Sequence, residues 1–161
     1  MSYTAVRNTF AFYHETGHVL VALAFNVDVI NVSFSQIKVN TLSFNRLSTL
    51  DQVTFYLAGE AAFDIWYKVN KHKALFSNVY VDEKSSHAQD DHFAVESILR
   101  NRYFLARLPI FRRFVFSYFK SKGYKKAYKI VNANFKLADK IVEKLFEYTN
   151  LNSSQLDNII Q

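Results

Sequence analysis

Residues 14–18 read HETGH and lie within an apolar segment that runs from Phe10 to Phe25. Positions i and i+4 of a helix share one face, so His14 and His18 can offer two imidazole nitrogens to one metal ion. Glu15 follows the first histidine directly and is placed to act as general base toward a water molecule. This HExxH pattern combines two ligands and a base on one helix, and it predicts a zinc-dependent metallopeptidase.

The composition indicates one mainly helical domain. The chain has 161 residues and is 50% hydrophobic, which allows a single sizeable core. One Pro and three Gly are too few for a Gly/Pro-rich all-β domain. The absence of cysteine excludes disulfides and thiolate metal sites and fits a reducing compartment. We therefore expect a mainly α (α+β) fold over residues 1–161, a helical zincin-like peptidase domain with a small β element after the HExxH helix.

The charge and hydropathy patterns bear on partners and location. The net charge is +6, and Lys and Arg concentrate between Arg100 and Lys144. We interpret this as a solvated basic face and expect no nucleic-acid partner, because residues 120–129 carry charge without a recognised binding motif. The start of the chain lacks a signal-peptide pattern, and the best apolar stretch, residues 10–30, carries too many polar groups to span a membrane. These features predict a soluble, cytoplasmic protein.

Hydrophobic periodicity and turn residues divide the chain into expected elements. Gly17 is expected to let another element approach the first helix closely. The edge that would receive an extended peptide is placed at Asn40–Phe44. The expected elements are a helix over 3–26, short strands within 27–44, a helix over 47–69 capped by Ser48 or Asp51, a loop over 70–89, a helix over 90–102, a helix break or start at Pro109, a turn over 120–124, a helix over 125–148, and a short helix within 150–161 capped by Asn152 or Ser153.

A catalytic zinc ion usually takes three protein ligands, so a third ligand is required beyond the HExxH helix. The metzincin extension HExxHxxGxxH is absent. One candidate is Asp90, with Asp91 beside it, in the segment SHAQDDHFA at residues 86–94. The other is Glu60 in GEAAFD, residues 59–64, where an ExxxD spacing on a second helix is the pattern of gluzincins.

Several segments resemble the peptidase domain of the FtsH family of ATP-dependent zinc proteases. AFYHETGHVLV, residues 11–21, resembles the family's HEAGHAxV active-site helix. LAGEAAFD, residues 57–64, resembles the following LGGRAAEE helix, and residues 86–95 resemble the GASNDLxxAT segment. Residues 138–160 are loosely similar to the family's last helices. The resemblance implies a metal site of His14, His18 and Asp90, Zn²⁺ as cofactor, and Glu15 as the catalytic base.

The sequence also departs from that family. It contains no GxxxxGK[ST] loop, and the ATPase module and membrane anchor of the family have no counterpart in it. The Arg and Glu of the second motif are replaced by Glu60 and Phe63, and residues 100–129 do not follow the family. The resemblance therefore implies a stand-alone metalloendopeptidase without its own ATPase, acting on a peptide or protein. The alternative is a catalytically silent pseudopeptidase that binds peptides or proteins. The substrate and oligomeric state are not specified by the sequence.

Residues Tyr103–Phe119 are dense in aromatic residues and arginine. One interpretation is an amphipathic helix that contacts a membrane surface or a partner. The other is a core helix whose arginine side chains reach the solvent. We favour the core helix, because the aromatic side chains are too many to leave exposed.

Overall fold

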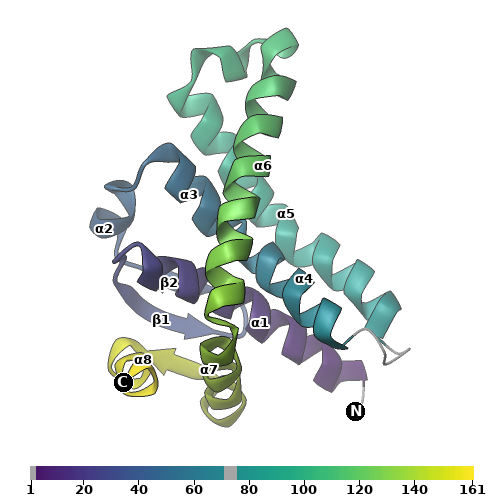
Figure 1. Cartoon of the computed structure of the whole chain (residues 1–161), viewed down its shortest axis with the longest axis vertical. Coiled ribbons are helices and arrows are strands. Elements are labelled where there is room, and N and C mark those ends of the chain that lie inside the picture. Colours follow the sequence, from purple (N-terminus) through teal and green to yellow (C-terminus); the bar gives the residue numbers. More distant parts are fainter. Residues whose placement is uncertain (1–2, 71–75) are drawn as a thin grey trace.

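The protein folds around its first helix. The computed structural model describes residues 3–70 and 76–161 of the chain. Helix α1 (Tyr3–Ala24) packs against α4 (Ala58–Asn70), α5 (Phe76–Arg102), α6 (Pro109–Ala133) and α7 (Phe135–Tyr148) (Figure 1). Its apolar side chains are buried on several sides, as expected for a helix that is apolar almost all round. The mainly α prediction is confirmed.

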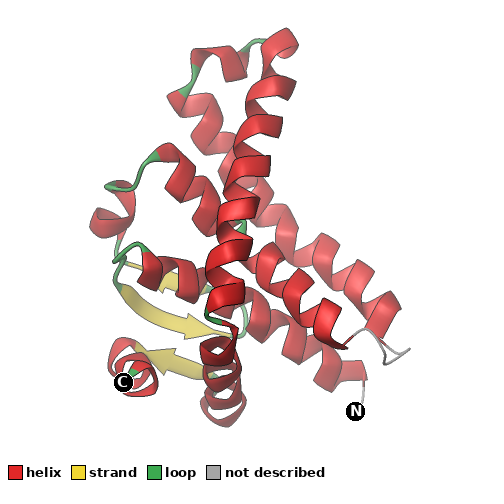
Figure 2. Cartoon of the chain, viewed as in Figure 1, coloured by secondary structure: helices red, strands yellow, loops and turns green. Residues whose placement is uncertain are grey.

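A small antiparallel sheet lies beside the helices (Figure 2). Its strands are β1 (Val29–Ser33), β2 (Ile37–Val39) and β3 (Asn150–Asn152), in the order β2-β1-β3. The predicted β element after the HExxH helix is confirmed, but its third strand comes from the C-terminal part of the chain. The first two strands form a hairpin that leaves β2 at an edge of the sheet.

The segment predicted to be the peptide-binding edge is instead helical. Residues Thr41–Asn45 form α2, and the Asn40 side chain caps this helix by accepting hydrogen bonds from the backbone N–H groups of Leu42 and Ser43. The prediction of an edge at Asn40–Phe44 is therefore wrong, because an asparagine before a short helix is a strong N-cap. The sheet edge lies just before it, at β2.

Four of the predicted elements differ from the structure. The helix expected over 47–69 is two helices, α3 (Thr49–Tyr56), capped by Ser48, and α4, which meet at Leu57. The loop expected over 70–89 is helical from Phe76, since that polar stretch contains neither Gly nor Pro to interrupt a helix. The turn expected over 120–124 lies inside α6, and the helix expected over 125–148 is divided at Asn134.

Two other expectations are confirmed. Pro109 occupies the first turn of α6, and a short 3-10 helix, η1 (Phe104–Arg107), precedes it. The last helix, α8 (Ser153–Ile160), is capped by Asn152, whose side chain accepts from the Gln155 backbone while the Gln155 side chain accepts from the Asn152 backbone. No helix among the described residues is both long enough and apolar enough to cross a membrane.

Candidate metal centre

Helix α1 presents both histidines of the HExxH motif to the same point inside the protein. His14, Glu15 and His18 are at most 5% exposed, which is rare for three ionisable side chains on one helix. Gly17 lies on the same helix against α4, where a Cβ atom would overlap the Ala58 carbonyl group and the Ala62 side chain. The expected close approach at Gly17 is present, and it allows α1 to pack tightly against α4.

Asp91, on α5, completes a triangle of donor atoms with the two histidines. Its Oδ2 atom lies 3.1 Å from Nε2 of His14 and 3.2 Å from Nε2 of His18. The two Nε2 atoms lie 3.2 Å from each other. Among the described residues, His14, His18 and Asp91 form the only group of three such side chains close enough to hold one metal ion.

The three distances are compatible with three ligands of a single metal ion. Ligand atoms about 2.0–2.1 Å from a tetrahedral zinc ion are separated by about 3.3 Å, close to each side of this triangle. Asp91 Oδ2 is buried, yet no described residue gives it a hydrogen bond of good geometry. A cation between the three atoms would coordinate this buried carboxylate oxygen together with the two imidazole nitrogens.

A backbone carbonyl orients His18 toward this point. Nδ1 of His18 lies 2.8 Å from the carbonyl oxygen of Phe55, so Nδ1–H donates and Nε2 is directed to Asp91 and His14. Metal-binding histidines typically donate their second ring N–H to a carbonyl or carboxylate group in this way. The Phe55 carbonyl is thus an orienting group that the HExxH pattern does not reveal.

Gly59, on α4, makes room for the other histidine. A Cβ atom at this position would overlap the imidazole ring of His14. The absence of a side chain at Gly59 therefore leaves the space that the His14 ring occupies. The sequence analysis quoted Gly59 only as part of a motif, and no spacing rule could have linked it to His14.

The charges of the cluster depend strongly on one another. Burial alone would lower the pKa of His18, but the Asp91 carboxylate, with smaller contributions from Glu15 and the Phe55 carbonyl, raises it to about 9. Burial opposes ionisation of Asp91, yet the two imidazole rings outweigh it and hold the pKa of that carboxyl well below its usual range. In the metal-free protein, Asp91 is therefore charged and His18 holds a proton that a metal ion must displace.

Glu15 faces the same cleft as the three donor residues. Burial raises the pKa of Glu15 to about 7, and the Asp91 charge acts in the same direction. The His18 charge and a hydrogen bond with the Ile37 backbone counteract part of this rise. A carboxylate that gains and loses a proton near neutral pH is suited to general acid–base catalysis. The contact with the Ile37 backbone also places Glu15 beside the edge strand β2.

A cleft lies over the site. It has a volume of about 480 Å³ and is bounded by the HExxH residues, by residues 35–37 and Val39 at the sheet edge, and by Phe44, Phe55 and Tyr56. Among the described residues β2 pairs only with β1, so its second edge carries no described strand. The segment predicted as a peptide-binding edge, Asn40–Phe44, follows this strand directly.

The other two candidates for the third ligand lie elsewhere. Asp90 is exposed at the cleft, and its neighbour Asp91 contacts the histidines, because successive residues of a helix point about 100° apart. Glu60 is directed to another contact, with its Oε2 atom 3.2 Å from Nε2 of His92. Asp91, which the sequence analysis named only as the neighbour of Asp90, is the residue that the structure brings to His14 and His18.

The resemblance to the FtsH peptidase domain implies Asp90 as the third ligand, whereas the structure brings Asp91 to the two histidines. The aligned position, Asp90, is not the one that meets the histidines, although the HExxH residues occupy the expected places. No protein-family model matches the chain, and no curated protein matches it, so this resemblance rests on the quoted segments alone.

Proposed function

We propose that the protein is a zinc-dependent metalloendopeptidase with a catalytic site similar to that of the FtsH peptidase domain. The observation that carries the proposal is the triangle of His14, His18 and Asp91 donor atoms with a buried glutamate next to it. Two imidazoles and one carboxylate are a common ligand set of catalytic zinc, which keeps a further position for water or substrate. When bound there, zinc would polarise a peptide carbonyl and acidify a water molecule.

The chain's own residues would supply binding, orientation and proton transfer. His14, His18 and Asp91 would hold the ion, and the Phe55 carbonyl would keep the His18 ring in its binding orientation. Glu15 would accept a proton from the attacking water and later deliver it to the leaving amine. Burial of Glu15 supports this role, since a carboxylate away from bulk water binds and releases a proton closer to neutral pH.

The edge of β2 would bind the substrate. An extended peptide that pairs with Ile37–Val39 would pass along the cleft beside Glu15, because Ile37 contacts that carboxylate through its backbone. Backbone pairing of this kind favours unfolded or flexible substrates, since a folded chain does not offer a free strand. Such substrates suit a peptidase that has no unfolding module within this sequence.

The decisive experiment compares Glu15→Gln with the wild-type protein. Metal content after zinc loading is measured by mass spectrometry, and cleavage is followed with fluorescently labelled casein as an unfolded substrate. We expect about one zinc per chain in both proteins and cleavage by the wild type alone, because Gln keeps the shape of Glu15 but cannot accept the proton. Glu60→Gln is the matched control, since Glu60 lies outside the cluster, and it should retain cleavage.

The outcomes separate two functions. Zinc-dependent cleavage that survives in Glu15→Gln would refute the mechanism. Zinc binding without any wild-type cleavage of unfolded substrates would instead favour the alternative, a catalytically silent peptide-binding module. Stoichiometric iron in place of zinc would contradict the cofactor assignment, because two histidines and one carboxylate also suit non-haem iron.

A further inference from the structure

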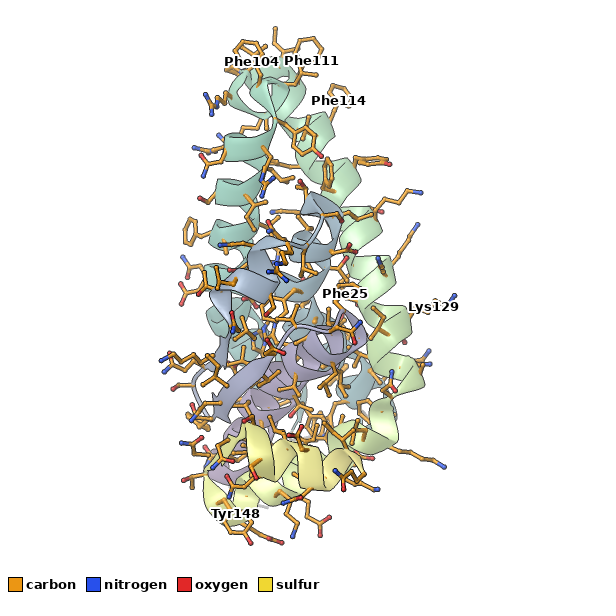
Figure 3. The ribbon with its side chains drawn as sticks, turned by 90° about the vertical axis from the view of Figure 1, so that its left-hand side faces the viewer. Phe25, Phe104, Phe111, Phe114, Lys129 and Tyr148 are labelled. Carbon is orange, nitrogen blue, oxygen red and sulfur yellow. The ribbon has the colours of Figure 1, made fainter. Side chains whose placement is uncertain are left out.

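The end of the molecule farthest from the sheet exposes a group of large apolar side chains. Figure 3 shows Phe104, Phe111 and Phe114 together at this end, where α5, η1 and the start of α6 meet. Phe104 is 70% exposed, Phe114 73% and Ile110 77%, and Leu105 and Phe111 are also exposed. We call Phe104, Leu105, Ile110, Phe111 and Phe114 the aromatic tip.

The aromatic tip is not part of the core beneath it. That core contains Val95, Leu99 and Phe116, with Val115 and Phe119 packed against it. The preferred interpretation of residues 103–119 as a core helix is therefore correct only for one face of α6. The tip residues point away from this core. Exposed apolar groups of this size typically mark a binding surface.

The charge around the tip indicates what the surface binds. The sequence contains no Asp or Glu between Glu96 and Asp139, a stretch that includes the whole tip and is rich in Arg and Lys. Glu96 is already paired, with Arg112 at 3.0 Å and Arg100 at 3.5 Å. Arg102, Arg107 and Arg113 are exposed and form no ion pair with any other described residue.

We propose that the aromatic tip docks on an anionic lipid bilayer surface, with Phe104, Ile110 and Phe114 in the headgroup region and Arg102, Arg107 and Arg113 against the lipid phosphates. Apolar side chains inserted among headgroups, ringed by cations, are the usual features of an interfacial membrane contact. The aromatic tip lies where the chain turns from α5 through η1 into α6, at one end of the molecule. It can therefore enter the headgroup layer without a change in the fold. This proposal is independent of the metal centre.

Co-sedimentation of the full chain with lipid vesicles tests the proposal. We expect binding to vesicles of phosphatidylcholine with phosphatidylglycerol, much weaker binding to phosphatidylcholine alone, and a decrease with added salt. The double variant F104S/F114S should bind at least about tenfold more weakly, because two apolar anchors are lost. R107Q/R113Q should lower binding to the anionic vesicles specifically.

The matched control is L42S/F93S, which removes two exposed apolar side chains outside the tip. It should bind like the wild type. A second readout uses Phe114→Trp: the native Trp66 is buried, so a blue shift of fluorescence with anionic vesicles would report insertion of residue 114. Equal binding by the wild type and F104S/F114S, or no binding to anionic vesicles, would overturn the proposal. So would a wild-type dimer that F104S/F114S converts to a monomer, because a second copy would then cover the tip.

Discussion

Replacing Asp91 by Asn is the sharpest test of the metal centre. The substitution keeps the size of the side chain but removes the charge of the oxygen that lies 3.1 Å from His14 and 3.2 Å from His18. Asp90→Asn is the matched control, since it makes the same change at the exposed neighbouring position of the same helix. The alignment with the FtsH family predicts the larger effect at Asp90, whereas the structure predicts it at Asp91.

The expected loss follows from the number of ligands. Structural zinc sites with four protein ligands bind with about 10–16 kcal/mol at neutral pH, or about 2.5–4 kcal/mol for each ligand. Losing one ligand should therefore weaken zinc binding by about a hundredfold or more, at about 1.4 kcal/mol for each factor of ten. Asp90→Asn should change the affinity by less than about threefold, because an exposed charge near the site acts only through screened electrostatics.

Zinc affinity is best measured by competition with a chromogenic chelator. Thermal melting alone would mislead, because Asp91→Asn also removes the carboxylate that stabilises the charged His18 in the metal-free protein. Circular dichroism of both variants shows whether the helical fold is retained. Equal losses in the two variants, or a larger loss in Asp90→Asn, would refute the assignment of Asp91 as the third ligand.

Two substitutions and one measurement on the wild-type protein test the surroundings of the site. Gly59→Ala should weaken zinc binding about ten- to a hundredfold, measured by the same competition, because its Cβ would displace the His14 ring; unchanged affinity would exclude this positioning role. Gly17→Ala should lower the unfolding free energy by about 2 kcal/mol in urea titration, since overlap with the Ala58 carbonyl outweighs the gain in helix propensity. Zinc binding at pH 7 should release a proton, because the pKa of His18 is raised to about 9 in the metal-free protein. For the same reason, the zinc affinity should rise with pH up to about that value. Calorimetry in buffers of different ionisation enthalpy counts the released protons, and a count of zero would contradict the raised pKa.

The sequence was sufficient to predict the features that depend on local spacing. The i, i+4 separation of His14 and His18, the start of α6 at Pro109 and the cap of α8 at Asn152 all follow from a few neighbouring residues. The absence of Gly and Pro from residues 76–102 carried the same kind of information. The polar composition of residues 76–89 predicts a loop, although a polar helix is equally compatible with it.

The missed features depend on contacts between distant parts of the chain. The choice between Asp90 and Asp91 is set by the rotation of α5 against α1, and one residue along a helix changes that direction by about 100°. The predicted turn over 120–124 contains Gly123, which instead lies inside α6, where a Cβ atom would press against Val53 of α3. Neither the choice of Asp91 nor the packing of Gly123 can be predicted from neighbouring residues in the sequence. Both depend on how the helices pack in three dimensions.

Helix α5 joins the metal centre and the aromatic tip, yet the two proposals can be tested separately. Asp91 and Arg102 are eleven residues apart on this helix, which corresponds to about 16 Å along its axis. This separation is about twice the Debye length of about 8 Å at physiological salt, so changes in charge at the tip are strongly screened at the site. The tip variants F104S/F114S and R107Q/R113Q should therefore bind zinc as tightly as the wild type, and a tip variant that lost zinc would show that α5 itself had moved or unfolded.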